Sequence, residues 1–391
     1  MPKPIARVFA KKCSRRTALK QGLASTALAG IALRGGALCA QAPAPLPPRP
    51  WVTIRGIYGG FPRQILERGE TPADYGVNAI WVGSGGLNAG EIDRYHKLGV
   101  KVFAEFNSMH AAQYLKDHAD AAPIGPDGKP SPPPSGWQGV SPFHAGYRQD
   151  RMTEFRRVLK TFDIDGIWLD YHHAHASWEQ AEPNLPDTDF SPTALKSFTE
   201  KTGISLPDNA PAASKLLLSV HRQAWTNFRC AIFTDWVREY RAILDEVRPK
   251  ALLGTFHCPW SPEDFGGAIR EKLAIDLVAQ AKYLDVFSIM PYHARFGHAN
   301  NPAWIARQTK SLAGSLNLQG KPDEKHKIWP IVQLADWGER VPVEQVQAVI
   351  DQGTQSPVTG VMVFHWSGVS KEWEKAEAMK QAYVAMRPTA G

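Results

Sequence analysis

Eight short apolar runs, separated by stretches with helical periodicity, are the feature that most constrains the fold of this chain. Runs rich in β-branched and aromatic residues are typical of parallel strands that are buried on both faces. The sequence between them predicts helices over Glu91–Leu98, Asp150–Phe162 and part of Ser214–Arg248. The predicted strands are Trp51–Ile57, Ala79–Val82, Val100–Phe106, Gly166–Asp170, Ala251–His257, Val286–Pro291, Ile328–Leu334 and Val361–Trp366.

This alternation predicts an α/β fold, a (β/α)8 TIM barrel, as one domain over residues 51–388. The glycine fingerprint of a doubly wound dinucleotide-binding sheet is missing, which disfavours that alternative. Two long segments, Pro123–Gly139 and His172–Asp189, follow the third and fourth predicted strands. We expect them to be βα loops at the C-terminal face, where barrel active sites are built.

Residues 1–42 have the features of an export signal. The run Ser14-Arg15-Arg16-Thr17-Ala18-Leu19-Lys20 resembles the twin-arginine motif. A weakly apolar stretch follows, but Arg34 interrupts it, so no stable membrane span is expected after the leader is cleaved. We expect residues 43–50 to be an extended, mobile proline-rich linker, and the protein to be periplasmic or secreted.

The formal charge of +7 comes from this leader, which holds eight basic residues and no acidic one. The rest of the chain has 37 basic residues against 38 acidic ones. Such a balance lacks the basic surface that binds phosphates, so a nucleic-acid partner is not expected. Cys230 and Cys258 lie in the barrel region without a Cys-x-x-Cys spacing, which predicts neither a zinc motif nor a particular disulfide.

Asp170 is the strongest candidate for a catalytic residue. It ends the fourth predicted strand in the segment Phe162–Tyr171, where Asp165-Gly166 turns the chain into the strand. A carboxylate at that position points into the mouth of a barrel, where it can serve as nucleophile or general acid. The alternative is an aspartate that caps a turn or forms an ion pair.

Several motifs surround this segment: His144–Arg148, DGIWLDY, Ser177-Trp178-Glu179, Phe190-Ser191-Pro192 and the helix start Leu195–Phe198. Together they resemble the glycosyl-hydrolase-like TIM-barrel proteins, best over residues 140–260. The resemblance implies a sugar-polymer substrate and functional roles for Asp170 and Glu179. DGIWLDY is also similar to the motif of family 18 chitinases, but Trp168 and His172 replace two of its acids, so the chitinase mechanism is not expected.

Glycoside hydrolysis needs a second carboxyl group to act with the first. The candidates are Glu105 at the end of the third strand, Asp336 after the seventh, Glu179 in the loop after the fourth, and Glu263 with Asp264 after the fifth. Strand ends fix geometry better than long loops, which favours Glu105 and Asp336, whereas the resemblance favours Glu179.

Aromatic residues and histidines also follow the predicted strands. Aromatic faces stack on pyranose rings, and imidazoles bond to hydroxyl groups, so a carbohydrate cleft is predicted. The aromatic residues concerned are Trp81, Trp137, Tyr171, Trp178, Trp260, Tyr292, Trp337 and Trp366. The candidate substrate contacts are Tyr171, His172, His257, Trp260, Tyr292, His293, Trp337, His365, Trp366 and Arg55.

Three alternatives remain open at this point. The cluster His172, His173 and His175, with histidines at other strand ends, would suit a metal-dependent hydrolase. The first strand lacks the His-x-His of such barrels, so no metal or cofactor is expected. A carbohydrate-binding barrel without catalysis and a cell-envelope scaffold are the other two. The sequence favours a glycoside hydrolase that cleaves an oligosaccharide or polysaccharide with paired carboxylates.

Overall fold

The computed structural model describes residues 46–131, 139–174, 176–321 and 323–387. The expected leader, Trp137 and His175 lie outside the described residues. The described residues form one compact unit. Within its described part, no helix has both the length and the apolar character that a membrane span needs.

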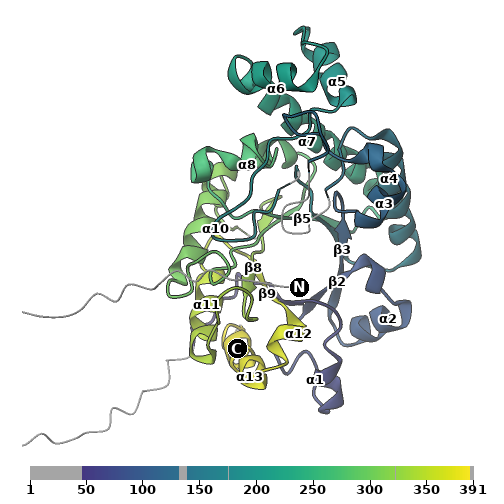
Figure 1. Ribbon diagram of the computed structural model, residues 1–391. Coiled ribbons are helices and arrows are strands. Elements are labelled where there is room, and N and C mark those ends of the chain that lie inside the picture. The colour runs from purple at the N-terminus through teal and green to yellow at the C-terminus, as the bar shows by residue number, and fades with distance from the viewer. Residues whose placement is uncertain (1–45, 132–138, 175, 322, 388–391) are drawn as a thin grey trace, which may run out of the picture. The chain divides into compact units, whose positions relative to one another are not determined.

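The centre of this unit is a parallel sheet surrounded by helices, an α/β barrel architecture (Figure 1). The described residues contain nine strands, and every neighbouring pair is parallel. Their order across the sheet is β7-β6-β5-β4-β3-β2-β1-β9-β8. The strands are β1 (Ile54–Tyr58), β2 (Ala79–Gly83), β3 (Lys101–Asn107), β4 (Gly166–Asp170), β5 (Leu252–His257), β6 (Val286–Ile289), β7 (Lys327–Ile328), β8 (Ile331–Gln333) and β9 (Gly360–Phe364).

A strand is present at each of the eight predicted places, but the seventh prediction needs a correction. Instead of one strand over Ile328–Leu334, the chain forms β7 and β8, separated by Trp329 and Pro330. Proline has no N–H to donate to a ladder, which explains the interruption. β7 pairs with β6 and β8 pairs with β9, so this one segment supplies both outer strands of the sheet.

The helices lie around the sheet, and α5 and α6 extend beyond α7 (Figure 1). The predicted helices are present as α2 and α4, while the end of α6 and all of α7 occupy the third predicted stretch. The helices are α1 (Arg63–Glu67), α2 (Ala89–Lys97), α3 (Ala112–Asp117), α4 (Ala145–Thr161), α5 (Pro192–Thr202), α6 (Ala210–Ser219), α7 (Arg222–Val247), α8 (Ala268–Glu271), α9 (Leu277–Gln280), α10 (Ala303–Leu316), α11 (Val346–Gly353), α12 (Trp366–Val369) and α13 (Trp373–Ala385).

Alternate residues of each strand point to opposite faces and so build two apolar cores. Ile167 and Leu169 of β4 pack in the larger core together with buried side chains of the helices. Trp168, between them in sequence, packs in a second cluster with Trp81 and Phe103 from β2 and β3. The second cluster fills the space that the curved sheet encloses.

Glycines make room for the tryptophans of this interior. A Cβ on Gly56 would lie 2.3 Å from the Trp81 ring, and one on Gly254 would lie 2.2 Å from the Trp168 ring. Trp81 and Trp168 meet edge to face with ring centroids 5.4 Å apart. Trp81, which we counted among the cleft aromatics, therefore belongs to the packed interior.

The described part of the proline-rich segment makes contacts with the domain. Leu46 is buried in the larger core. The Arg49 guanidinium is also buried, where it forms an ion pair with Asp351 and a hydrogen bond to the Thr354 hydroxyl. Residues 46–50 thus pack on the domain, and the Arg49 pair is an interaction that a freely moving linker lacks.

The close fit between Trp168 and Gly254 predicts the cost of a single added methyl group. Gly254→Ala should lower the free energy of unfolding by about 1–3 kcal/mol, because Trp168 and the strand must shift to admit the Cβ. Gly314→Ala is the control, since this exposed position in α10 has no neighbour within 4 Å. It should raise stability by about 0.5–1 kcal/mol through helix propensity. Denaturant unfolding measures both, and equal midpoints for the two variants would contradict the packing argument.

Candidate active site

A cavity opens at the carboxyl ends of the strands. Its volume is about 310 Å³, at the lower end of the range of roughly 300–1,000 Å³ typical of ligand sites. Strands β1, β4, β5, β8 and β9 and the loops after β4, β6, β8 and β9 contribute to it. The residues that line it are Tyr58, Gly59, Asp170, Tyr171, Glu179, Phe256, Met290, Tyr292, Ile331, Trp337, Phe364 and His365.

Asp170 lies at the bottom of this cavity. It is the last residue of β4 and faces the interior side of the sheet, two positions after Trp168. Its side chain is buried, and the Tyr171 N–H donates a hydrogen bond of 2.9 Å to Oδ1. Burial raises the pKa of Asp170 well above its ordinary value, and the negative charges of Glu105 and Glu179 raise it further.

Glu105 on β3 is the nearest carboxyl partner of Asp170. The Tyr58 hydroxyl donates a hydrogen bond of 2.8 Å to Glu105 Oε2. The Glu105 carboxyl group in turn lies near enough to Asp170 to add to the raised pKa of Asp170, which favours the protonated form of Asp170. Burial, followed by the charge of Glu105, raises the pKa of Tyr58.

Glu179 is the second carboxyl group in the cavity lining. It comes from the loop after β4 and is half-buried. Burial raises its pKa to about 7, although the positive charge of Arg295 acts in the opposite direction. The charge of Glu179 contributes to the raised pKa of Asp170, whereas Arg295 favours the ionised form of Glu179. Of these two groups, Asp170 is therefore the one that the site favours in its protonated form.

Arg295 and Gln333 connect the loops that carry Glu179 and Trp337. Arg295 Nε donates to the Glu179 carbonyl oxygen at 2.5 Å, and the guanidinium lies 4.7 Å from the centre of a Trp337 ring. Gln333, at the end of β8, accepts a hydrogen bond from the Arg295 N–H and donates one to the Trp337 carbonyl oxygen. The Glu179 backbone is thus fixed by a network that begins on a strand.

Aromatic rings form much of the remaining wall. The Tyr292 ring lies 4.6 Å from that of Phe364 and 5.5 Å from that of Trp337. His365 lines the same space, and its Nδ1 accepts a hydrogen bond from the Gly368 N–H. A neutral His365 therefore carries its hydrogen on Nε2 and can donate it. The cavity lining includes four residues that the sequence predicted as substrate contacts: Tyr171, Tyr292, Trp337 and His365.

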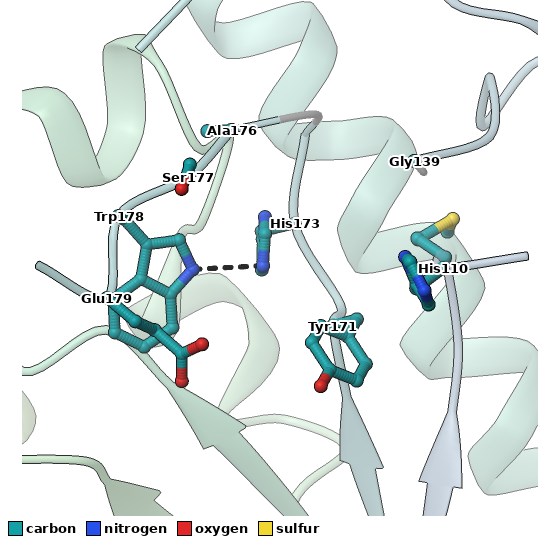
Figure 2. Close-up of a pocket in the computed structure, with 9 residues that line it drawn as sticks. His110, Gly139, Tyr171, His173, Ala176, Ser177, Trp178 and Glu179 are labelled. Atoms are coloured by element: carbon teal, nitrogen blue, oxygen red, sulfur yellow. Dashed lines mark hydrogen bonds between the residues drawn. The ribbon is translucent and has the colours of Figure 1, made fainter. Parts of the chain in front are cut away.

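A second, smaller cavity adjoins the first, and Figure 2 shows the residues that line it. The two share Tyr171 and Glu179 in their linings. Figure 2 shows the Trp178 indole beside His173, to which its N–H donates a hydrogen bond of 2.9 Å. The sequence analysis did not predict five of the lining residues, which are Tyr58, Phe256, Met290 and Phe364 of the first cavity and His110 of the second.

The structure does not bring Asp336 into the cavity. Its carboxylate pairs with the Lys375 ammonium at 2.8 Å and accepts the Val341 N–H at 2.9 Å. Partial burial would raise the pKa of Asp336, but the hydrogen bond and charge of Lys375 lower it overall. Asp336 follows the end of β8 by three residues, and its side chain bonds to Lys375 of α13, whereas the next residue, Trp337, lines the cavity. We correct its role to an ion pair with α13.

Three histidines predicted as substrate contacts are buried elsewhere. His172 lies between the Ser108 hydroxyl and the Phe233 carbonyl oxygen, and burial lowers its pKa to about 4. His293 bonds through Nε2 to Gln345. His257 faces the side of β5 opposite to the cavity residue Phe256, and burial lowers its pKa to about 3.

Trp260, Trp366 and Arg55 are also outside the cavity lining. Trp260 packs on Trp178 and Phe265, and the Trp366 indole N–H donates to Gln64. The Arg55 guanidinium donates to backbone carbonyl oxygens of Val52 and Gly76, near the start of β1 and far from the carboxyl ends of the strands. These side chains stabilise the fold around the site.

Among the described residues, the histidines that suggested a metal-dependent hydrolase do not gather at one place. His172 and His173 bond to different partners, and His175 lies outside the described residues. Among the described side chains, no three of His, Cys, Asp or Glu are arranged to hold a metal ion.

Comparisons with known proteins give information on the fold. No protein-family model matches the sequence, and no curated protein sequence matches it. The structure is similar to the glycoside hydrolase domain of PgaB (BpsB) from Bordetella bronchiseptica, with a TM-score of 0.62 and 15% identity. That match covers 88% of this chain and all of the other.

Two further solved structures are similar over most of this chain. They are the β-galactosidase from the psychrophilic Marinomonas ef1 (TM-score 0.61, 13% identity, 85% of this chain) and the α-L-fucosidase isoenzyme 2 from Paenibacillus thiaminolyticus (TM-score 0.53, 12% identity, 87%). The matches span 59% and 49% of those longer chains. The expected resemblance to glycosyl-hydrolase-like barrels is confirmed, at the level of the fold.

The raised pKa of Glu179 predicts how stability depends on pH. The ordinary pKa of Glu is roughly 4.3, whereas the folded state holds this proton up to about pH 7. The contribution of Glu179 to stability is therefore present below the ordinary value and lost as pH rises through 7. The Glu179→Gln variant has no carboxyl group to ionise at this position, so it does not lose stability in this way. It should be more stable than wild type by about 1–2 kcal/mol at pH 8 and nearly equal to it at pH 4.

Asp336→Asn is the matched control for this measurement by denaturant unfolding. Because the pKa of Asp336 is lowered, its contribution is present above the ordinary value and is lost only in acid. This variant should therefore be less stable than wild type by the same amount at pH 6 and pH 8. A difference between Glu179→Gln and wild type that does not grow between pH 4 and pH 8 would contradict the burial of the Glu179 charge.

Proposed function

We propose that this protein is a glycoside hydrolase that cleaves an oligosaccharide or polysaccharide with Asp170 and Glu179 as its two catalytic carboxyl groups. The observation that carries this proposal is that both line one aromatic cavity, where burial and the charge of Glu105 raise the pKa of Asp170. Aromatic faces suit the apolar faces of sugar rings, and the carboxyl groups suit their hydroxyls. The glycoside hydrolases with the same fold support the assignment.

We also infer that the sheet is an eight-fold TIM barrel. The two short strands β7 and β8 count as one strand broken at Pro330, and together they join β6 to β9. The cavity then lies at the C-terminal mouth of the barrel, the usual place for an active site in this fold.

The two carboxyl groups would divide the reaction between them. Asp170 donates its proton to the glycosidic oxygen as the bond from that oxygen to the anomeric carbon breaks. The Glu179 carboxylate acts on the opposite side, either by accepting a proton from the attacking water or by forming a glycosyl ester that water then cleaves. The products are two sugars with a free hydroxyl at each new end. Glu105 remains a positioning residue that keeps Asp170 protonated.

Substitution of the two carboxyl groups tests this proposal. A panel of plant and microbial glycans should yield reducing ends with wild-type protein, and Asp170→Asn and Glu179→Gln should each lower kcat by about 10²–10⁴-fold. Asp336→Asn, which changes a carboxylate outside the cavity, should keep kcat within about twofold of wild type. Equal release by wild type and Asp170→Asn would exclude Asp170 from the mechanism. Sugar binding without any turnover would instead indicate a binding barrel.

The pH profile separates the two roles. Since Glu179 must be ionised and its pKa is about 7, wild-type kcat/KM should rise as pH increases through 7. It should fall again at the higher pH where Asp170 loses its proton. A kcat/KM that falls as pH increases through 7 would indicate that Glu179 is the proton donor and Asp170 the carboxylate.

We further propose that residues 1–42 direct export by the twin-arginine route and are then removed. The support is the Arg15-Arg16 pair and the apolar stretch that follows it. Replacing both arginines by lysine should keep the protein in the cytoplasm at its full length, whereas wild type should be shortened and recovered outside the inner membrane. Fractionation followed by mass measurement checks this. Export of the double variant at wild-type level would exclude the route.

A further inference from the structure

The cavity that Asp170 and Glu179 line has room for one sugar ring. Its volume is about 310 Å³. An apolar cavity of about 150 Å³ holds benzene, and a hexopyranose has twice as many non-hydrogen atoms, so one such sugar needs about 300 Å³. Two linked rings would need about 600 Å³ by the same proportion. The size of the cavity therefore matches a single hexose.

Packed rings close the floor and one wall of this cavity. Below it, the rings of Trp168 and Trp329 stack with centroids 5.9 Å apart in the space that the sheet encloses. On the wall, the rings of Tyr292, Phe364 and Trp337 lie with centroids 4.6–5.5 Å apart in all three pairs. Rings at these separations are in contact, so they leave no passage for a chain of sugars.

The wall formed by Tyr171 and Glu179 is closed as well. The second cavity adjoins the first here, since both are lined by these two residues. Its volume is about 20 Å³, which is room for a water molecule and not for a sugar ring. None of its nine described lining residues is exposed, and the buried Trp178 is fixed by its hydrogen bond to His173 and its stack on Phe296. A sugar chain therefore does not continue past Tyr171.

Glycines border the cavity where β1 and β2 end. Gly59 lines the cavity and Gly60 follows it, while Gly83 ends β2 and Gly85 comes two residues later. A Cβ on Gly83 would lie 3.7 Å from Glu105 Oε2, which places the end of β2 beside the carboxyl groups. Among the described residues, no atom lies within 4 Å of a Cβ on Gly60 or Gly85. Loops without side chains at these positions leave the cavity open where its other walls are closed.

We propose that the protein removes single sugars from the end of a chain. The terminal ring fills the cavity, and the rest of the chain leaves across the glycine loops, residues 59–60 and 83–86. An internal ring of the chain is not a substrate, because it has a neighbour on each side and the described walls leave a way out on one side. Each turnover consumes one water molecule and gives a monosaccharide and a chain shorter by one ring. This inference rests on the proposed function for the cleaved bond, which joins the enclosed ring to the next.

The first products from defined substrates test this inference. Wild-type protein is incubated with cellohexaose, maltohexaose, β-1,4-mannohexaose and β-1,4-galactohexaose, and mass spectrometry identifies the products from the earliest time at which any are present. The first products should be a monosaccharide and a pentasaccharide. Disaccharides, trisaccharides or tetrasaccharides among the first products would overturn the inference.

Binding tests the enclosed ring without turnover. In Asp170→Asn protein, NMR titration gives Kd for glucose, mannose and galactose and for the same hexasaccharides. Because only the terminal ring is enclosed, at least one monosaccharide should bind with a Kd within about fivefold of that of its hexasaccharide. A larger difference in every pair, or no binding by any of these sugars, would overturn the inference.

A large side chain on the glycine loops tests the route of the chain. Gly85→Trp should fold, because no atom lies within 4 Å of its Cβ and its φ is outside the left-handed region. It should lower kcat/KM for a hexasaccharide by about tenfold or more and keep that for the nitrophenyl glycoside of the same single sugar within about twofold. Gly314→Trp, on the exposed face of α10, is the control and should change neither. A folded Gly85→Trp protein that loses nothing on the hexasaccharide, or as much on both substrates, would overturn the inference.

The result can be separated from that of the proposed function. If wild type cuts hexasaccharides at internal bonds, the hydrolase proposal stands and action at the chain end is excluded. If a monosaccharide binds nearly as tightly as its hexasaccharide but wild type cleaves no glycan, the cavity for one ring stands and hydrolysis is excluded.

Discussion

The aromatic packing inside the sheet determines where a ligand can bind. Trp81, Trp168 and Trp329 approach one another with ring centroids 5.4–6.4 Å apart and close the interior. They fit because Gly254 and other glycines face them, so the neighbouring strand has no side chain at those points. With the interior filled, the cavity that Asp170 lines lies above it, at the carboxyl ends of the strands. The cavity floor is therefore apolar, and any carboxyl group that reaches it loses much of its hydration.

This apolar floor gives the carboxyl cluster its chemistry. Asp170 follows Trp168 on the same side of β4, and desolvation is the main cause of its raised pKa. The Tyr58 hydroxyl donates a hydrogen bond to Glu105, and the charge of Glu105 adds to the raised pKa of Asp170. Buried acids of this kind reduce stability near neutral pH, and a protein retains such a cost where the protonation states serve a reaction. The same packing that stabilises the fold thus favours the protonated form of Asp170.

The sequence predicted the elements of the fold well, because apolar runs and helical periodicity report burial directly. The split of the seventh strand at Pro330 was the main departure. Asp170 could be placed because it ends a strand of clear pattern. Glu179 could be named only from the resemblance, since its loop is fixed by Arg295 and Gln333, which are distant in sequence. A loop held by such contacts leaves no periodic signal. Asp336 illustrates the converse, because nearness to a strand end did not place it in the cavity.

Strand pleating explains most of the remaining errors among the strand-end residues. Every second residue of a strand faces the interior, so a glycine or tryptophan known to face inward fixes the direction of the others. On β5, Gly254 and Phe256 face inward and His257 faces the helices. Counting from Gly56 likewise places Tyr58 in the cavity and Arg55 outside it. The interior contacts of the tryptophans could not be predicted from the sequence. Once one inward-facing position is known on a strand, however, the alternation of side chains identifies which residue of that strand faces the cavity.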